Sequence, residues 1–444
     1  MSSPSAATVL RVALVGVIFV PVVDRYLVSL LVPPDLRPAT NLLSELLLLA
    51  VAIGIGLWAW RAGTFLPALR HPVIGLIGAF ALAGLVSAAV NGVPPVIAVA
   101  GIAFTIEAVT LFALARMIGF TAGQARLAGI GFMIMALVVA SLALAQVLLA
   151  ADFLGLQSFT GRFSEGHRVA AFLVNPNMLG AVLALAIPIP LLAAIHEDGR
   201  RRQLYGAATF VLALALLYTF SRGAWLGLAL AAVAIGLVVE WRALAILSLV
   251  GLLAFGAALV LPRHVLDPES ADVEFDLLSA TVGRLETISE GSDLRLQFVE
   301  NASPIVADHL VLGAGPGRYG GAVAWRFGSP LYEEYTDGSV PEGRTVDNFW
   351  LHLLAESGLL GTLLYGAALA AGAWGALSTA RRRAGWARVV AGAAAAMAVV
   401  IGVDSLTEML LEGNTTAFAT WFFLGLASAL SMGAAGGDAS VAGG

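Results

Sequence analysis

The stretch TVDNFWLHLLAESGLLG, residues 345–361, decides how this chain folds, because a polar segment ends there and an apolar one begins. Upstream, residues 263–344 hold 14 acids and six arginines, a net charge of −8. Most of the remaining chain is apolar, with Leu, Ala and Val dominating. The stretch therefore predicts a junction where a helix leaves water and enters a membrane.

The composition of the whole chain predicts an integral membrane protein. Of the 444 residues 59% are hydrophobic and 12% are charged, whereas soluble domains carry roughly 25% charge. About 20 apolar residues span a bilayer as a helix, and the alternation typical of barrel strands is missing. The fold class is an all-α polytopic membrane protein with about twelve transmembrane helices and one large extracytoplasmic loop. The windows are roughly 7–31, 41–60, 72–90, 93–115, 126–150, 172–195, 203–219, 223–240, 243–262, 347–374, 388–405 and 415–433.

The distribution of arginines predicts the orientation of the chain in the membrane, since the chain contains no lysine. With a cytoplasmic N-terminus, twelve arginines in short loops fall on the cytoplasmic side, in agreement with the positive-inside rule. Residues 1–262 then hold transmembrane helices one to nine, 263–346 the extracytoplasmic loop, 347–434 helices ten to twelve, and 435–444 a disordered tail. The arginines are Arg61, Arg70, Arg116, Arg126, Arg200, Arg201, Arg202, Arg242, Arg381, Arg382, Arg383 and Arg388.

The extracytoplasmic loop is expected to contain one helix and one mobile part. Ser292 is predicted to be the N-cap of a helix that runs from Asp293 towards Asn301 and ends near Pro304. The composition of residues 328–344 predicts a mobile loop that could close over a substrate. The negative charge argues against binding nucleic acid or anionic lipid surfaces.

Several cofactor and metal chemistries are excluded by residue types. Cysteine is absent, so there can be no disulfide or thiolate metal site. A Walker A loop needs a lysine, and no H-E-x-x-H zinc helix occurs. Thiolate metal sites, phosphate-binding P-loops and this type of zinc helix are therefore excluded.

The turn Ser221-Arg222-Gly223 separates two apolar windows. An arginine near the membrane centre costs about 2.5–3.5 kcal/mol, and less towards the interface. Arg222 could be an interfacial arginine that reaches water and has no task. It could instead bind phosphate, because a guanidinium pairs with phosphate through two parallel hydrogen bonds. The tight turn and the outward position, where positive charge is disfavoured, favour phosphate binding.

Asp347 and Asn348 stand at the start of the tenth window. Both residue types are favoured helix N-caps. Asp347 could also be a general base that accepts a proton from an attacking hydroxyl. The two roles are compatible, since capping would fix the group's position. His352, five residues on and about 7.5 Å deeper along a helix, is expected to be a packed core histidine.

Other polar residues carry weaker signals. Arg168 and Arg295 could be solvated surface residues or ligands of an anion. Acids inside or beside membrane helices are functional candidates by default, but they rank low here because the sequence names no partner for them. They are Glu45, Glu107, Asp404, Glu408 and Glu412.

From about residue 160 the chain resembles the bacterial O-antigen ligase and polysaccharide polymerase family, whose members transfer glycans from undecaprenyl pyrophosphate. The order and spacing of several short motifs carry the resemblance. They are Asn175-Pro-Asn177, Ser221-Arg-Gly-Ala-Trp-Leu226, the helix bearing Arg295, Leu312-Gly-Ala-Gly-Pro-Gly317, Asp347-Asn348 and Gly358-Leu-Leu-Gly361.

The resemblance implies a C-type glycosyltransferase-like fold and an inverting transfer at the outer face of the bacterial inner membrane. It also implies that this transfer needs neither a metal site nor a cofactor. Arg222 and Arg295, with Arg168 as a third, would bind the pyrophosphate, and Asp347 with Asn348 would act on the acceptor. The partners would be an undecaprenyl-pyrophosphate-linked glycan, an acceptor hydroxyl on a glycan or lipid, and the bilayer, but no nucleic acid. The family commonly has His-Asn at Asp347-Asn348, so polymerases are as strong a match as lipopolysaccharide ligases.

Two other classes of function stay open at this point. A transporter or flippase of lipid-linked saccharides would use the same arginines and form no new bond. A non-catalytic assembly factor would have less use for charged residues at the membrane boundary.

Overall fold

The structure, a computed structural model, describes residues 4–31, 43–149, 168–171, 173, 175–261, 294–336 and 346–432. Within these ranges every regular element is a helix. The helices are α1 (Pro4–Leu31), α3 (Leu43–Ala62), α4 (Phe65–Leu69), α5 (Pro72–Val90), α6 (Pro95–Ile106), α7 (Val109–Ile118), α8 (Ala122–Leu149), α10 (Pro176–Ala186), α11 (Pro188–His196), α12 (Gly199–Tyr218), α13 (Arg222–Val238), α14 (Trp241–Val260), α16 (Leu294–Asp308), α17 (Ala322–Phe327), α18 (Pro330–Thr336), α19 (Phe349–Arg382), α20 (Gly385–Asp404) and α21 (Asn414–Met432).

The expected class, a multi-pass helical membrane protein, is supported. Among the described residues, eight helical spans are long and apolar enough to cross a membrane, or up to nine if α6 and α7, bent by 57°, form one span. The apolar parts of α1 and α13 are shorter, and α12 begins with three arginines. The predicted count of about twelve is therefore not confirmed, and the orientation and segment boundaries stay predictions.

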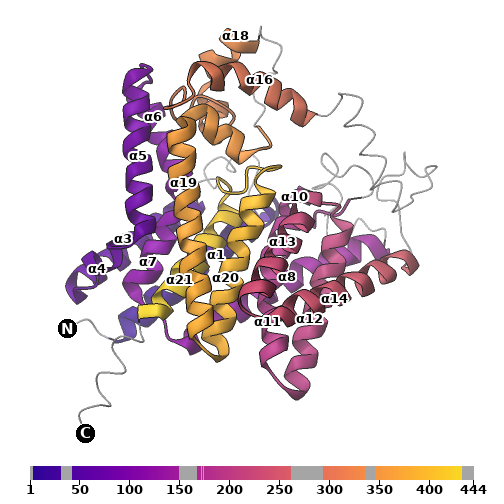
Figure 1. Cartoon of the computed structure of the whole chain (residues 1–444). Coiled ribbons are helices and arrows are strands. Elements are labelled where there is room, and N and C mark those ends of the chain that lie inside the picture. Colours follow the sequence, from indigo (N-terminus) through magenta and orange to yellow (C-terminus); the bar gives the residue numbers. More distant parts are fainter. Residues whose placement is uncertain are drawn as a thin grey trace.

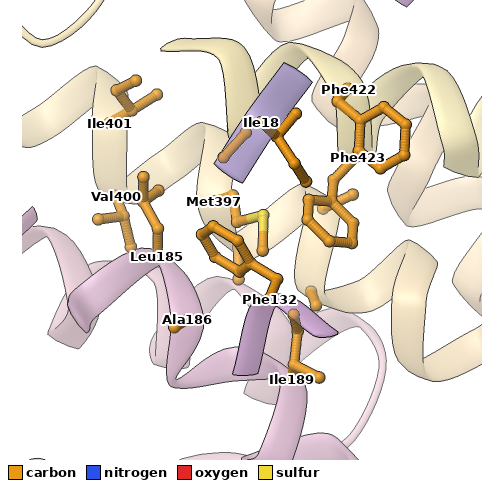
Figure 2. Close-up of a cluster of buried hydrophobic side chains, with 14 of the residues drawn as sticks. Ile18, Phe132, Leu185, Ala186, Ile189, Met397, Val400, Ile401, Phe422 and Phe423 are labelled. Atoms are coloured by element: carbon orange, nitrogen blue, oxygen red, sulfur yellow. The ribbon is translucent and has the colours of Figure 1, made fainter. Parts of the chain in front are cut away.

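The core of the bundle forms around α20 and α21. Figure 2 shows Phe132 of α8, Met397 of α20 and Phe423 of α21 packed together, with Ile18 of α1 beside them. α20 packs against α10, α11, α13, α19 and α21. Its run of alanines at 393–396 is buried, and small side chains let helices approach closely in a membrane.

Helices α16 and α18 lie at one end of the bundle, where α16 packs against α18 and α19 (Figure 1). The prediction that the α16 helix ends near Pro304 is wrong, because the helix continues through this proline to Asp308. The predicted cap Ser292 lies outside the described residues. The expected mobile loop at 328–344 is also partly wrong, since α18 occupies 330–336.

Helix α19 is interrupted at Gly358, whose φ of 60° is left-handed. A chain segment from the α16 side enters this break: Leu359 N donates to Leu310 O at 2.9 Å, and Ala314 N donates to Ala355 O at 2.9 Å. Gly313 and Gly358 allow the close approach, since a Cβ on either would lie within 2.5 Å of opposing backbone. The break fixes the loop 313–321 against α19.

Candidate functional site

The candidate site is built around the turn at 404–408, which follows α20. The N-terminus of α19 is attached to this turn, because Phe349 N donates to Ser405 O at 2.9 Å and to Glu408 O at 3.3 Å. On the other side, Val346 N donates to Gly320 O at 3.0 Å. The backbone on both sides of the two predicted site residues, Asp347 and Asn348, is therefore held in place.

Asn348 is the N-cap of α19, and its Oδ1 accepts from Leu351 N at 3.0 Å. The expectation that this pair of residues caps the helix is thus confirmed for Asn348. Asp347 precedes the cap and is partly buried. A capped, pinned helix start gives Asp347 a defined backbone position at the end of the bundle that faces α16 and α18.

The N-terminus of α13 meets the same turn. A Cβ on Gly223 would lie 2.2 Å from Asp404 Oδ1 and 2.4 Å from Thr407 Oγ1, so only glycine fits. Arg222, the first residue of α13, is partly buried. Its guanidinium forms no hydrogen bond or ion pair with any described residue. Ser221, the cap residue, also gives no side-chain hydrogen bond to the first turn.

Arg168 is buried, and its guanidinium is bonded to the protein. Its Nε donates to Thr219 O at 2.8 Å, and a second nitrogen donates to the side-chain oxygen of Asn177. Asn177 in turn donates to the carboxylate of Glu408. These contacts connect the turn before α13, which contains Thr219, and the start of α10 to the 404–408 turn. They also bring the guanidinium of Arg168 and the carboxylate of Glu408 close together in a buried place.

The turn before α13 has a constrained backbone. Phe220 has a φ of 51°, which is unusual for a residue with a side chain. Thr219 Oγ1 accepts from Ser221 N at 3.2 Å, and Thr219 O accepts from Arg168. Such conformations persist only where the surroundings hold them, and they concentrate at functional sites.

Three helix N-termini thus converge on the 404–408 turn. They belong to α10, which Asn175 caps (Asn177 N to Asn175 Oδ1, 2.7 Å), to α13 and to α19. Helix N-termini carry partial positive charge and favour anions. With the guanidinium of Arg222, this end of the bundle offers positive potential beside the buried carboxylates of Asp404 and Glu408.

Arg295 is placed only by its backbone. It lies on α16, which packs against α19, while its side chain is outside the described part of the structure. The 404–408 turn therefore connects Arg168, the start of α13 with Arg222, and the Asp347-Asn348 pair. α16, which carries Arg295, packs against α19.

A second buried cluster lies one turn deeper on α19. Glu356 accepts from Gly317 N at 2.8 Å and from Tyr319 N at 2.7 Å, so it holds the 313–321 loop. His352 Nε2 lies 3.9 Å from the carboxylates of Glu356 and Glu412, and its Nδ1 lies 2.5 Å from Tyr319 O. The prediction of a buried, packed His352 is confirmed.

The loop has a further contact outside the membrane helices. Gly320 N donates to the hydroxyl of Tyr332 at 2.8 Å. Burial raises the pKa of Tyr332 above its ordinary value. The group therefore stays a neutral hydroxyl at physiological pH, and it fixes α18 over the loop.

Sequence reasoning ranked three acids low that the structure supplies with partners. Glu408 accepts from Asn177, Asp404 lies against Gly223, and Glu412 Oε1 accepts from Ala322 N at 3.1 Å. A signal was available, because Asp404, Glu408 and Glu412 follow one another at intervals of four residues, at the point where an apolar window ends.

Comparison with protein-family models gives one match. Residues 207–366 match the model described as O-Antigen ligase. The match runs from α12 to the middle of α19, so it contains Arg222, Arg295 and Asp347, while Arg168 precedes it. No curated protein sequence is significantly similar to the chain.

Proposed function

We propose that this chain, whose residues 207–366 match the model of the O-antigen ligase family, transfers a glycan from undecaprenyl pyrophosphate to an acceptor hydroxyl. Glycan transfer of the ligase or polymerase type is the general activity of this family. The observation that carries the proposal is the convergence of three helix N-termini, with Arg168, Arg222 and Asp347, on the 404–408 turn.

Arg222 binds the pyrophosphate in this proposal. Its guanidinium has no protein partner among the described residues, it starts α13, and the adjacent helix dipole favours an anion. Arg295, a residue of α16, is the second proposed ligand of the pyrophosphate. Arg168 already donates to Thr219 O and Asn177, so it contributes charge and holds the turn in shape. Together these groups stabilise the charge that develops on the leaving pyrophosphate.

Asp347 acts as the general base. It takes the proton of the acceptor hydroxyl while that oxygen forms a bond to the anomeric carbon. The bond from this carbon to the pyrophosphate oxygen breaks, and the electron pair leaves with undecaprenyl pyrophosphate. Attack from the opposite side inverts the configuration. The glycosyl–pyrophosphate bond of the donor is already activated, and the family resemblance implies that the step includes neither a nucleotide nor a metal.

The test uses the full chain in lipid nanodiscs with a lipid-linked oligosaccharide and an acceptor. Product glycan and released carrier pyrophosphate are both measured, with and without EDTA. Asp347→Asn should lower the rate at least ~100-fold, because general-base catalysis contributes typically 10²–10⁴-fold. Glu300→Gln, an exposed acid on α16, is the matched control. Full activity of Asp347→Asn would contradict the assignment of Asp347 as the general base. Loss of transfer in EDTA would contradict the proposal that the reaction needs no metal.

Arg222→Lys tests the pyrophosphate assignment. Loss of a charged hydrogen bond of about 1.5–3 kcal/mol corresponds to roughly 10- to 150-fold weaker donor binding. Arg201→Lys, an exposed arginine of α12, serves as control. Unchanged donor binding would contradict the assignment. Movement of the lipid-linked saccharide across the bilayer without glycan transfer would show a transporter instead.

A further inference from the structure

Four large apolar side chains are exposed in the segments that flank the loop 313–321. Leu310 and Val311 follow α16 and are 47% and 63% exposed, while Trp325 and Phe327 on α17 are 58% and 56% exposed. We call these four residues the apolar foot. Exposed apolar groups that continue a larger apolar surface mark a place that another apolar phase covers.

One half of the apolar foot continues the membrane-facing surface of α19. Leu359 N donates to Leu310 O at 2.9 Å and Leu360 N donates to Val311 O at 3.1 Å. Leu359, Leu360 and, one turn further, Leu363 are themselves exposed on the long apolar span of α19. Leu310 and Val311 are therefore attached by hydrogen bonds to backbone at the edge of the lipid-facing surface.

The other half continues the surface of α6. α17 packs against α6, which exposes Val96 and Val99. Within α17, Val323 is buried, whereas the Trp-Arg-Phe sequence at its end is exposed. Aromatic side chains beside an arginine are typical of the membrane interface, where rings lie at headgroup level and the cation remains hydrated.

We propose that the apolar foot is inserted in the lipid leaflet on the side of α16 to α18, the outer leaflet in the orientation that the arginines predict. The occupant of this surface is lipid, since both halves continue surfaces that face lipid. The segment is acidic overall, so apolar contact rather than anionic headgroups holds it there. The loop 313–321 lies between the two halves in sequence and is thereby kept at the membrane boundary.

The chain has no cysteine, so each introduced cysteine is the only labelling site. Leu310→Cys, Trp325→Cys and Phe327→Cys are labelled with an environment-sensitive fluorophore in nanodiscs that contain spin-labelled lipid. Leu363→Cys on α19 is the lipid-facing control, and Glu334→Cys, exposed on α18, is the water-facing control.

Quenching at all three positions should reach at least half of that at position 363, and a quencher near the headgroups should act more strongly than one at mid-bilayer. Quenching no greater than at position 334 would overturn the proposal. So would efficient disulfide-linked dimers at position 325 together with weak lipid quenching, since a second copy of the chain would then cover this surface. Neither readout depends on glycan transfer, so the result is independent of the proposed function.

Discussion

Substitution of Gly223 by alanine should separate the helix carrying Arg222 from the 404–408 turn. The added Cβ would lie 2.2 Å from Asp404 Oδ1, which is 1.2 Å closer than an ordinary contact of 3.4 Å. A second oxygen, Thr407 Oγ1, would lie at 2.4 Å. Asp404 is a short side chain with 0% exposure, so it has little room to give way. The start of α13 must therefore move by about 1 Å.

Such a shift has two expected effects of different size. Overpacking of a buried contact costs about 1–3 kcal/mol of stability, which a multi-span bundle should survive. A misplacement of about 1 Å in a group that binds the reacting centre can lower the rate ~100-fold. We therefore expect Gly223→Ala to fold, with a modestly lower Tm, and to transfer glycan about a hundred times more slowly than the wild type.

The assay compares initial rates of glycan transfer in nanodiscs with Tm from intrinsic fluorescence. Gly251→Ala on α14 is the matched control, because a Cβ there meets nothing within 4 Å. This control should keep both the rate and the Tm. A Gly223→Ala protein with a wild-type rate would refute the reasoning, since the position of α13 against the turn would then be irrelevant to the chemistry.

Two further predictions concern the scaffold. Replacing Glu356 by Ala leaves two buried loop amides without their acceptor, at about 1–3 kcal/mol each, so hydrogen exchange at those amides should rise sharply; unchanged exchange would contradict the role given to Glu356. His71 caps α5 (Val73 N to Nδ1, 3.3 Å), and burial, with the nearby Arg116, lowers its pKa to about 4. The unfolded chain thus binds this proton first, so stability should fall as pH drops from about 6.5 towards 4. His71→Asn, which can cap without titrating, should flatten that part of the Tm–pH profile; an unchanged profile would refute the assignment.

The sequence alone determined the class of protein and the place of most membrane helices. A window of about 20 apolar residues is a local property, because each helix satisfies its own backbone hydrogen bonds in lipid. The membrane helices α5, α14 and α19 to α21 could therefore be predicted from the sequence. Short motifs around Arg222 and Asp347 carried the family resemblance, which the domain match at residues 207–366 supports.

Local signals misled where neighbouring structure overrides them. Pro304 suggested a helix end, because proline removes a hydrogen bond and clashes with the preceding turn, yet α16 continues past it to Asp308. The polar composition of residues 328–344 suggested a loop, yet α18 forms there, beside α16. In both places packing between elements decided the outcome.

What only the tertiary structure decided is which polar groups meet. Glu408 is 231 residues away from Asn177 in the sequence, yet Arg168, Asn177 and Glu408 form one connected chain of hydrogen bonds. A glycine is required at position 223 only because the end of α20 packs against it. Hydropathy says that a segment crosses the membrane but carries no information on its neighbours. Those neighbours follow from side-chain packing between helices, which no single stretch of the chain contains.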